Sequence, residues 1–336
     1  MGVTGVTAAI CTHAGADRIE PALHSLLEQS DRPDEILVLE NAPPDGLTAD
    51  LVRDRFPGVR YEVELVPGLD FARNAVLQRA TQPIVAFLDD DAVADPEWIG
   101  KMRRAFAGNP RLVACCCRVT PLRLDTEGRR LFEANGGFDR GPDPVLLPRD
   151  AHRTLNGYQG SLVAWATRIA VGCGMAVRRR EALDLGGFDP ALDLGAALPG
   201  GGDCDFIWRA VAAGHEAAYL PDATIRHDHR RELDAAERQI IGHSRALVAL
   251  LTKIVGESSG AERRSALVFL GWRLLKPGVR LTKRLVGNDP LPARVLVRLW
   301  WGSWTGLAAY GAARSEAQQR RNTFGQLSPL PQQRRP

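Results

Sequence analysis

Asp89, Asp90 and Asp91 are three consecutive acids that directly follow the apolar segment 84–88. Such a segment is typical of a buried strand in an open α/β sheet, where ligands bind at the carboxyl ends of the strands. One carboxylate directed at a divalent cation, with a neighbour directed at a hydroxyl, would bind a nucleoside diphosphate and its metal. The other interpretation is a solvated acidic turn that leads into the next helix.

The segments around these acids alternate between strand-like and helix-like patterns, which predicts a mainly parallel sheet flanked by helices. The predicted strands are residues 6–11, 35–39, 60–65 and 84–88, and the predicted helices between them are residues 16–29, 47–56 and 70–80. Residues 118–194 are irregular and contain several glycines and prolines, so loops are expected there, apart from a predicted strand over residues 167–177. Residues 217–225 are again strand-like.

Two widespread phosphate-binding motifs are missing from the sequence. The turn after the first strand, residues 11–17, has no G-x-G-x-x-G, and no G-x-x-x-x-G-K-[ST] occurs in the chain. These absences disfavour a nicotinamide dehydrogenase and a P-loop enzyme. The charge of a diphosphate would therefore have to be met by a metal and by side chains rather than by a glycine-rich cradle.

Several short motifs occur in the order that one family shows. They are Thr12-His13, Glu40-Asn41, Ala72-Arg73-Asn74, Asp89-Asp90-Asp91, Gly186-Gly187-Phe188-Asp189, the segment 201–209, and His227-Asp228-His229. Each is weakly specific alone, but the ordered set over residues 4–231 resembles the inverting glycosyltransferases of family 2. The resemblance implies the α/β GT-A fold of enzymes that use nucleotide-diphospho-sugars, a mainly parallel sheet flanked by helices, here with a C-terminal helical extension.

Carried over by position, the resemblance implies a set of residues that contact the nucleotide sugar. This set is Thr12, His13, Glu40, Arg73, Asp89, Asp90, Gly174 and Asp205. The resemblance also implies that Asp91 and His227 hold Mn²⁺ or Mg²⁺ against the diphosphate. Simpler roles are open for some of these residues, with Thr12 as a helix cap, Arg73 as an ion-pair partner and His227 as a structural histidine.

The general base is expected in the segment 198–209, which contains the glycine run 200–202. The resembling family usually has Glu-Asp there, with the Asp as base, whereas this chain has Gly202 before Asp203 and a second acid at Asp205. If a helix begins at Asp203, the two acids point about 200° apart, so only one can face the active site. We predict Asp203 as the base because a helix N-terminus favours its ionised form, and Asp205 has the alternative of pairing with Arg209.

The expected reaction is a single displacement that inverts the anomeric centre. A hexose-type sugar would move from a UDP-, GDP- or dTDP-linked donor to a hydroxyl of a glycan, a lipid-linked molecule or a small molecule, in polysaccharide, glycolipid or natural-product glycoside synthesis. One alternative is a catalytically inactive GT-A domain that serves as a membrane-associated scaffold. A second alternative, nucleotidyl transfer, lacks the glycine- and lysine-rich opening that it would need in residues 6–18.

Charge is unevenly distributed along the chain. Up to Arg231 the net charge is −7, whereas the remainder carries +10 together with four of the seven tryptophans. The helical apolar pattern of this remainder predicts an amphipathic extension that lies on an anionic membrane surface, with a buried helical pair or a dimer contact as the equal alternative. Nucleic acid is disfavoured as a partner because the charges alternate with long apolar runs.

The sequence thus predicts three parts: a catalytic domain over residues 1–231, the basic helical extension over residues 232–314, and a disordered tail over residues 315–336 that is rich in Gln, Arg and Pro. The uncharged run 299–313 has 15 residues, too few to span a bilayer. Residues 1–9 show no secretory signal, and three of the six cysteines are consecutive in an apolar stretch, which indicates buried thiols in a reducing compartment. We therefore expect a cytosolic protein with a peripheral contact at the inner face of the cell membrane.

Overall fold

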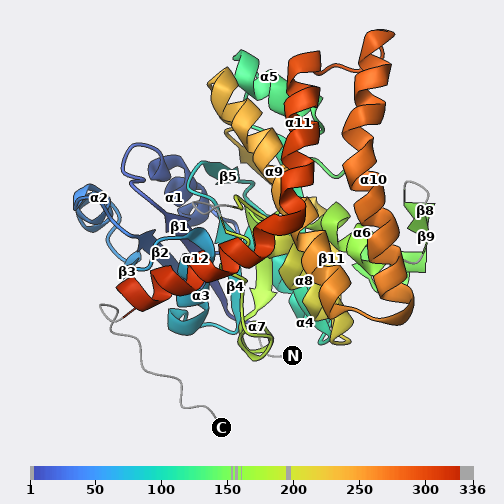
Figure 1. Cartoon of the computed structure of the whole chain (residues 1–336). Helices are drawn as coiled ribbons and strands as arrows, with labels where there is room; N and C mark the ends of the chain where they lie inside the picture. The colour runs from blue at the N-terminus through green and yellow to red at the C-terminus, as the bar shows by residue number, and fades with distance from the viewer. Residues whose placement is uncertain (1–3, 153, 156–157, 160, 194–197, 326–336) are drawn as a thin grey trace.

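The computed structural model describes residues 4–152, 154–155, 158–159, 161–193 and 198–325. Its centre is a nine-stranded sheet in the order β3-β2-β1-β4-β10-β6-β11-β5, with β7 beside β11 (Figure 1). The strands of this sheet are β1 (Val6–Thr12), β2 (Glu35–Asn41), β3 (Arg60–Glu64), β4 (Ile84–Leu88), β5 (Ala92–Ala94), β6 (Leu112–Pro121), β7 (Val145–Leu147), β10 (Gly174–Arg178) and β11 (Glu216–His227). A separate pair consists of β8 (Thr154–Leu155) and β9 (Tyr158–Gln159).

The sheet is mostly parallel. β3, β2, β1 and β4 run in the same direction, and so do β6 and β11. β10 is antiparallel to both β4 and β6 and joins the two parallel groups. The short strands β5 and β7 are antiparallel to β11. The carboxyl ends of β1 and β4 therefore lie next to each other, as the predicted ligand site requires.

Helices cover both faces of the sheet. They are α1 (Ile19–Leu27), α2 (Leu47–Arg55), α3 (Leu69–Arg79), α4 (Trp98–Gly108), α5 (Glu127–Ala134), α6 (Leu162–Ile169), α7 (Arg179–Asp184) and α8 (Gly202–Ala212). Alternate residues of each strand face opposite cores: Ala8 and Ala86 belong to the core under α1 and α4, whereas Ala9 and Val85 belong to the core under α3 and α8. The prediction of a mainly parallel α/β sheet flanked by helices is confirmed.

Two local predictions are wrong. The segment 167–177 is not one strand, because α6 continues through Ile169 and only Gly174–Arg178 forms β10. The hydroxyl of Ser161 accepts a hydrogen bond from the backbone N–H of Ala164, which caps α6 and commits the segment to a helix.

The tail is the second correction. A helix, α12 (Ala309–Phe324), covers the first part of the segment 315–336 that was expected to be disordered. Ala309, Ala313 and Ala317 form a buried stripe at four-residue spacing, and Arg320 donates to the carbonyl of Pro67 at 2.6 Å. Residues 326–336 lie outside the described part of the chain.

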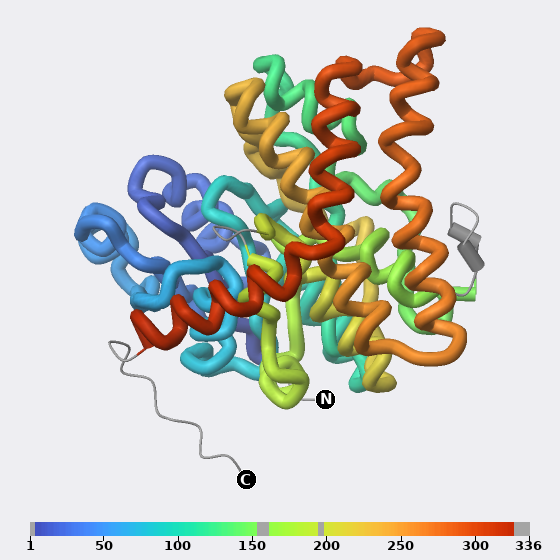
Figure 2. Tube along the Cα trace, viewed as in Figure 1, coloured from blue at the N-terminus to red at the C-terminus, as the bar shows by residue number. Residues whose placement is uncertain are grey.

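The C-terminal region forms α9 (Leu233–Glu257), α10 (Gly260–Leu285) and α11 (Ala293–Thr305), followed by α12. Figure 2 shows α9, α10 and α11 side by side at one end of the sheet, with α12 returning across the catalytic region toward α3. The apolar stripe predicted on α9 is buried against this region, with Leu250, Leu251 and Ile254 fully enclosed. Across the described ranges, no helix combines the length and the apolarity needed to cross a bilayer.

Candidate active site

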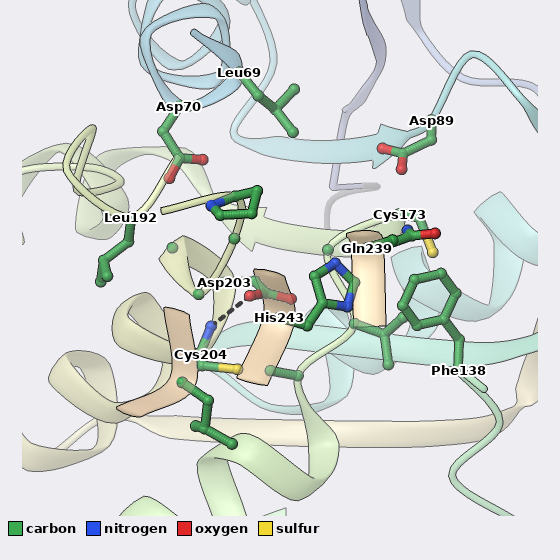
Figure 3. Close-up of a pocket in the computed structure, with 18 of the residues that line it drawn as sticks. Leu69, Asp70, Asp89, Phe138, Cys173, Leu192, Asp203, Cys204, Gln239 and His243 are labelled. Carbon is green, nitrogen blue, oxygen red and sulfur yellow. Dashed lines mark hydrogen bonds between the residues drawn. The ribbon is translucent and has the colours of Figure 1, made fainter. Parts of the chain in front are cut away.

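A cavity of about 900 Å³ lies at the carboxyl ends of β1 and β4. Its lining comes from the ends of these strands, the end of β11, the first turn of α8, and the C-terminal helices α9 and α10. Figure 3 shows Asp70, Asp89, Asp203 and His243 around this space. Residues from the predicted catalytic domain and from the extension therefore enclose the same cavity.

The β1 end of the cavity carries Thr12 and His13. The hydroxyl of Thr12 donates to Asp90 rather than capping the next helix, and Arg18 forms an ion pair with the same carboxylate at 2.9 Å. His13 Nδ1 lies 2.8 Å from the carbonyl oxygen of Asn41, which fixes its ring at the rim. Asp90 is thus held by protein groups, whereas its two neighbours remain directed at the cavity.

Asp89 and Asp91 meet His227 at the centre. Asp91 Oδ1 is 3.2 Å from His227 Nε2, and ligand atoms of Asp89, Cys173 and His227 lie within 4.8 Å of one another. Burial raises the pKa values of both carboxyls to about 6 and lowers the pKa of His227 to about 4, so each group would gain from a cation that offsets the lost hydration. Asp89 and His227, with the Asp91 carboxylate beside the imidazole, offer oxygen and nitrogen ligands of the kinds that bind Mn²⁺ or Mg²⁺.

The imidazole of His227 is oriented by a chain of contacts. His227 Nδ1 is 3.0 Å from His229 Nδ1, and His229 Nε2 is 2.7 Å from Glu133 Oε1. A proton on His229 Nε2, donated to Glu133, leaves Nδ1 of neutral His229 as an acceptor. His227 then donates from Nδ1 and keeps its Nε2 lone pair directed at Asp91, which is the tautomer that binds a metal. Cys173 differs, because burial raises the pKa of its thiol well above the usual value.

A buried ion pair forms the next part of the wall. Arg73 Nη1 is 3.1 Å from Asp70 Oδ1, and Arg73 Nη2 donates to the carbonyl of Gly172 at 3.2 Å. The other Asp70 oxygen, Oδ2, is buried without a hydrogen-bond partner among the described residues. A Cβ added at Gly202 would lie only 1.9 Å from this oxygen, so the Asp70 carboxyl fills the space that a side chain at position 202 would occupy.

Gly202→Ala is expected to destabilise the fold because of this contact. The new methyl must displace the Asp70 carboxyl and strain its pair with Arg73, at a cost of about 1–3 kcal/mol in the free energy of unfolding. In an Asp70→Ala background the same change is expected to be nearly neutral, since the space is then empty. Urea unfolding of the four proteins measures this coupling, with Gly256→Ala as the control because a Cβ there meets nothing within 4 Å. If Gly202→Ala lowered the free energy of unfolding equally in both backgrounds, the Asp70 carboxyl would not be the group that fills the space beside Gly202.

Asp203 lies in the first turn of α8 and lines the cavity. Its Oδ1 accepts a hydrogen bond from the backbone N–H of Cys204 at 2.8 Å, and its Oδ2 would lie 3.3 Å from a Cβ placed on Gly172. His243 of α9 lines the same cavity, burial lowers its pKa, and the charge of Asp203 acts on its ring. Asp203 is therefore a carboxyl group in the first turn of a helix that borders the cavity.

A family model described as "Glycosyl transferase family 2" matches residues 7–185. This stretch is more than half of the chain and contains β1, β4 and the three acids of the cavity. The chain belongs to glycosyl transferase family 2. The family resemblance of the sequence motifs is thereby confirmed.

Curated relatives are more distant. A pre-mycofactocin glycosyltransferase of Mycobacterium tuberculosis is 27% identical over 215 residues, which cover 61% of this chain and 41% of that protein. A glucosyl-dolichyl phosphate glucuronosyltransferase of Haloferax volcanii is 28% identical over 123 residues, 34% of this chain and 38% of that protein. The chain thus spans about two fifths of the length of the curated relatives that it matches.

Solved structures agree in fold. A mannosyltransferase from Pyrobaculum calidifontis in complex with GDP-Man and Mn²⁺ is similar over 96% of this chain and 88% of its own, with a TM-score of 0.57 and 18% identity. GalNAc-T7 with UDP, GalNAc and Mn²⁺ is similar over 87% of this chain and 59% of its own, with a TM-score of 0.52 and 13% identity. At these identities the likeness shows the GT-A-like fold alone.

The structure brings most of the predicted family 2 site residues together. The residues that line the one cavity are Thr12, His13, Arg73, Asp89, Asp90, Asp91, Asp203 and His227. Gly174 does not line it: a Cβ there would meet Cys117 and Ile225 inside the core, and Gly172 is the glycine that borders the cavity. The expectation for Gly174 is corrected to a glycine required by core packing.

Glu40 and Asp205 are two further corrections. Both side chains are fully buried outside the cavity lining. The carboxylate of Glu40 accepts from the hydroxyls of Thr48 and Tyr61 at the end of β2. Asp205 pairs with Arg209 at 2.7 Å and with Lys253 at 2.7 Å, so it ties α8 to α9. Asp203 and Asp205 lie about half a turn apart on α8, so Asp203 lines the cavity whereas Asp205 is buried outside it, as the helix geometry predicted.

The sequence reasoning missed the part of the lining that lies outside the family motifs. His243 of α9, and Arg273, Lys276 and Arg280 of α10, border the cavity but lie far along the chain from the acids. In the sequence these residues were part of the basic extension. The apolar pattern alone did not show which face of each helix would border the cavity. Asp70 was also missed, although Gly202 in place of the family's Glu was a signal that another group takes its space.

Proposed function

We propose that this protein is a metal-dependent, inverting glycosyltransferase that moves a hexose-type sugar from a nucleoside-diphosphate donor to an acceptor hydroxyl. The observation that carries the proposal is the single cavity that holds Asp203 together with Asp89, Asp91 and His227. It combines a base at a helix N-terminus with a donor set for a divalent cation, which are the two groups that such a displacement needs. The glycan, lipid-linked or small-molecule nature of the acceptor belongs to the same proposal.

The donor would lie along the strand ends. Thr12 and His13 stand at the end of β1 for the base and ribose, and Arg73 would face the diphosphate from α3. GDP-Man and UDP, each with Mn²⁺, are the ligands of two structural neighbours, which supports a UDP-, GDP- or dTDP-linked sugar here. Bound at Asp89, Asp91 and His227, Mn²⁺ or Mg²⁺ would supply Lewis-acid stabilisation of the leaving diphosphate.

Asp203 would remove the proton of the acceptor hydroxyl as the oxygen attacks the anomeric carbon from the side opposite the diphosphate. The bond from the anomeric carbon to the phosphate oxygen breaks in the same step, so the configuration inverts. The backbone N–H of Cys204 holds one carboxylate oxygen of Asp203 and leaves the other for this proton.

A thermal-shift screen tests the donor site. UDP, GDP, dTDP and their sugars are each added with and without Mn²⁺, and a ligand that binds the native state raises the melting temperature. We expect a metal-dependent rise with one nucleotide, followed by release of the nucleoside diphosphate when an acceptor is present. Release of pyrophosphate would instead indicate nucleotidyl transfer, and no rise with any nucleotide in a folded sample would favour the inactive scaffold.

We propose in addition that the extension contacts an anionic membrane surface at the cytosolic face. Helices α10 and α11 expose a set of large apolar side chains: Leu267, Val268, Trp272, Leu275, Val279, Val297, Trp300, Trp301 and Trp304. Arg294 and Arg298 are more than half exposed on α11, within a segment of net charge +10. Apolar side chains flanked by exposed arginines match a surface of anionic headgroups over acyl chains.

The double substitution Trp301→Gln and Trp304→Gln is expected to weaken vesicle binding by about tenfold or more, because both indoles leave the acyl boundary. Co-sedimentation with phosphatidylglycerol-containing vesicles measures the effect. Leu47→Gln is the control, because Leu47 is equally exposed but lies on α2 of the catalytic region. Binding that survives the double substitution, or that is the same on phosphatidylcholine alone, would refute the membrane contact.

A further inference from the structure

One face of α10 borders the cavity with basic residues. Arg273, Lys276 and Arg280 are spaced by three and four residues, so they lie on the same side of the helix, and all three line the cavity. This helix belongs to the extension, beyond the segment that the family model matches. The lining therefore combines Asp89 and Asp91 at the strand ends with three cations on α10, and we call the α10 part the basic end.

Lys276 is the group at this basic end that lacks a counter-charge of its own. Among the described residues, no hydrogen bond or ion pair joins its ammonium to another side chain. Asp289, the acid whose charge acts on Lys276, is held by Arg280 at 2.7 and 3.1 Å and by the backbone N–H of Leu291. Burial, together with Arg273 and Arg280, lowers the pKa of Lys276 to about 8. A cation placed in this way is stabilised by an incoming anion.

The charges that act on Lys276 most strongly come from its own surroundings at the α10 end. They are those of Arg273, Arg280 and Asp289. At the donor end, by contrast, Arg73 and the predicted metal site face the diphosphate. The charge of the donor diphosphate can thus be offset without the α10 cations. Because these cations also line the cavity, they are available to bind the acceptor.

We propose that the acceptor carries a phosphate group, and that Lys276 binds it with Arg273 and Arg280 at the α10 end of the cavity. This inference rests on the proposed glycosyl transfer, because it assigns this part of the cavity to the acceptor. The anionic group stays intact during the reaction: Asp203 takes the proton of a separate hydroxyl, while the α10 cations hold the acceptor by its charge.

Calorimetric titration tests the inference without knowledge of the acceptor. The full chain, saturated with Mn²⁺ and the nucleoside diphosphate that binds in the donor screen, is titrated with inorganic phosphate, a hexose 1-phosphate and a short alkyl phosphate. We expect Lys276→Met to weaken binding of the phosphate probes by about tenfold or more, Lys276→Arg to restore it, and Lys283→Met to leave it unchanged. Lys283 is the matched control because it is exposed on the same helix and does not line the cavity.

The probes separate the sources of the anion. Tighter binding of the hexose phosphate identifies a soluble acceptor, and tighter binding of the alkyl phosphate identifies a lipid phosphate, and either supports the proposal. Absence of phosphate binding in the loaded protein, or equal binding in Lys276→Met, overturns it. If no nucleotide binds the unmodified protein, the proposed function fails instead. The phosphate titration with Mn²⁺ alone then still decides whether binding depends on Lys276.

Discussion

Asp203→Asn is expected to lower the turnover number by about 10²–10⁴-fold while donor affinity stays the same. The amide cannot accept the proton of the attacking hydroxyl, whereas its oxygen can still accept the hydrogen bond from the Cys204 N–H. Release of nucleoside diphosphate with donor and acceptor present measures the rate, and the thermal shift with nucleotide and Mn²⁺ measures donor binding.

The neighbouring acid provides the matched control. Asp205→Asn is expected to lower the free energy of unfolding by about 3 kcal/mol, because it leaves the buried Lys253 with only part of its ion pairing. Asp203→Asn should leave the melting temperature nearly unchanged, so the two substitutions separate loss of chemistry from loss of stability. Full turnover in Asp203→Asn would remove Asp203 as the base.

Asp91→Asn is expected to reduce Mn²⁺-dependent binding of the nucleotide by about 100-fold or more. The substitution removes a carboxylate that lies 3.2 Å from Nε2 of His227, the imidazole that we propose as a metal ligand. Calorimetry with the nucleotide, with and without Mn²⁺, measures the loss, and the metal-independent part of the binding should be retained.

Asp90→Asn is the control for this second prediction. Its carboxylate is already held by Thr12 and Arg18, so we expect it to change the Mn²⁺ dependence much less than Asp91→Asn does. If Asp90→Asn abolished the metal dependence and Asp91→Asn did not, the assignment of ligands within the three acids would be reversed.

The extension connects the cavity with the rest of the molecule. Helix α9 contributes His243 to the lining and Lys253 to the buried ion pair with Asp205. Arg320 of α12 donates a hydrogen bond to the loop before α3. The helices that follow the catalytic region therefore take part in building the site. Substrate choice is expected to change with substitutions in α9 and α10, even though these helices lie outside the segment that the family model matches.

The sequence by itself determined the first four strands, β1 to β4, and the polar residues that follow β1 and β4 at the cavity. Apolar runs such as Ile84–Leu88 have one favourable place, in a buried parallel strand, and the polar residues that follow them must then meet at one edge of the sheet. The helical period also showed that Asp203 and Asp205 would face different ways. These features depend on local periodicity and strand order, which the sequence displays directly.

The tertiary structure alone decided which polar groups line the cavity and which are hydrogen-bonded or ion-paired inside the fold. Glu40 and Asp205 have the residue types of a binding site, but Thr48, Tyr61, Arg209 and Lys253 satisfy them inside the fold. In the sequence, Lys276 is one of many charged residues in a basic segment. Only the packing of α10 places it in the lining of the cavity. Lys253 lies 48 residues from Asp205 along the chain. The contact between them depends on how the helices pack, which periodicity within a segment does not specify.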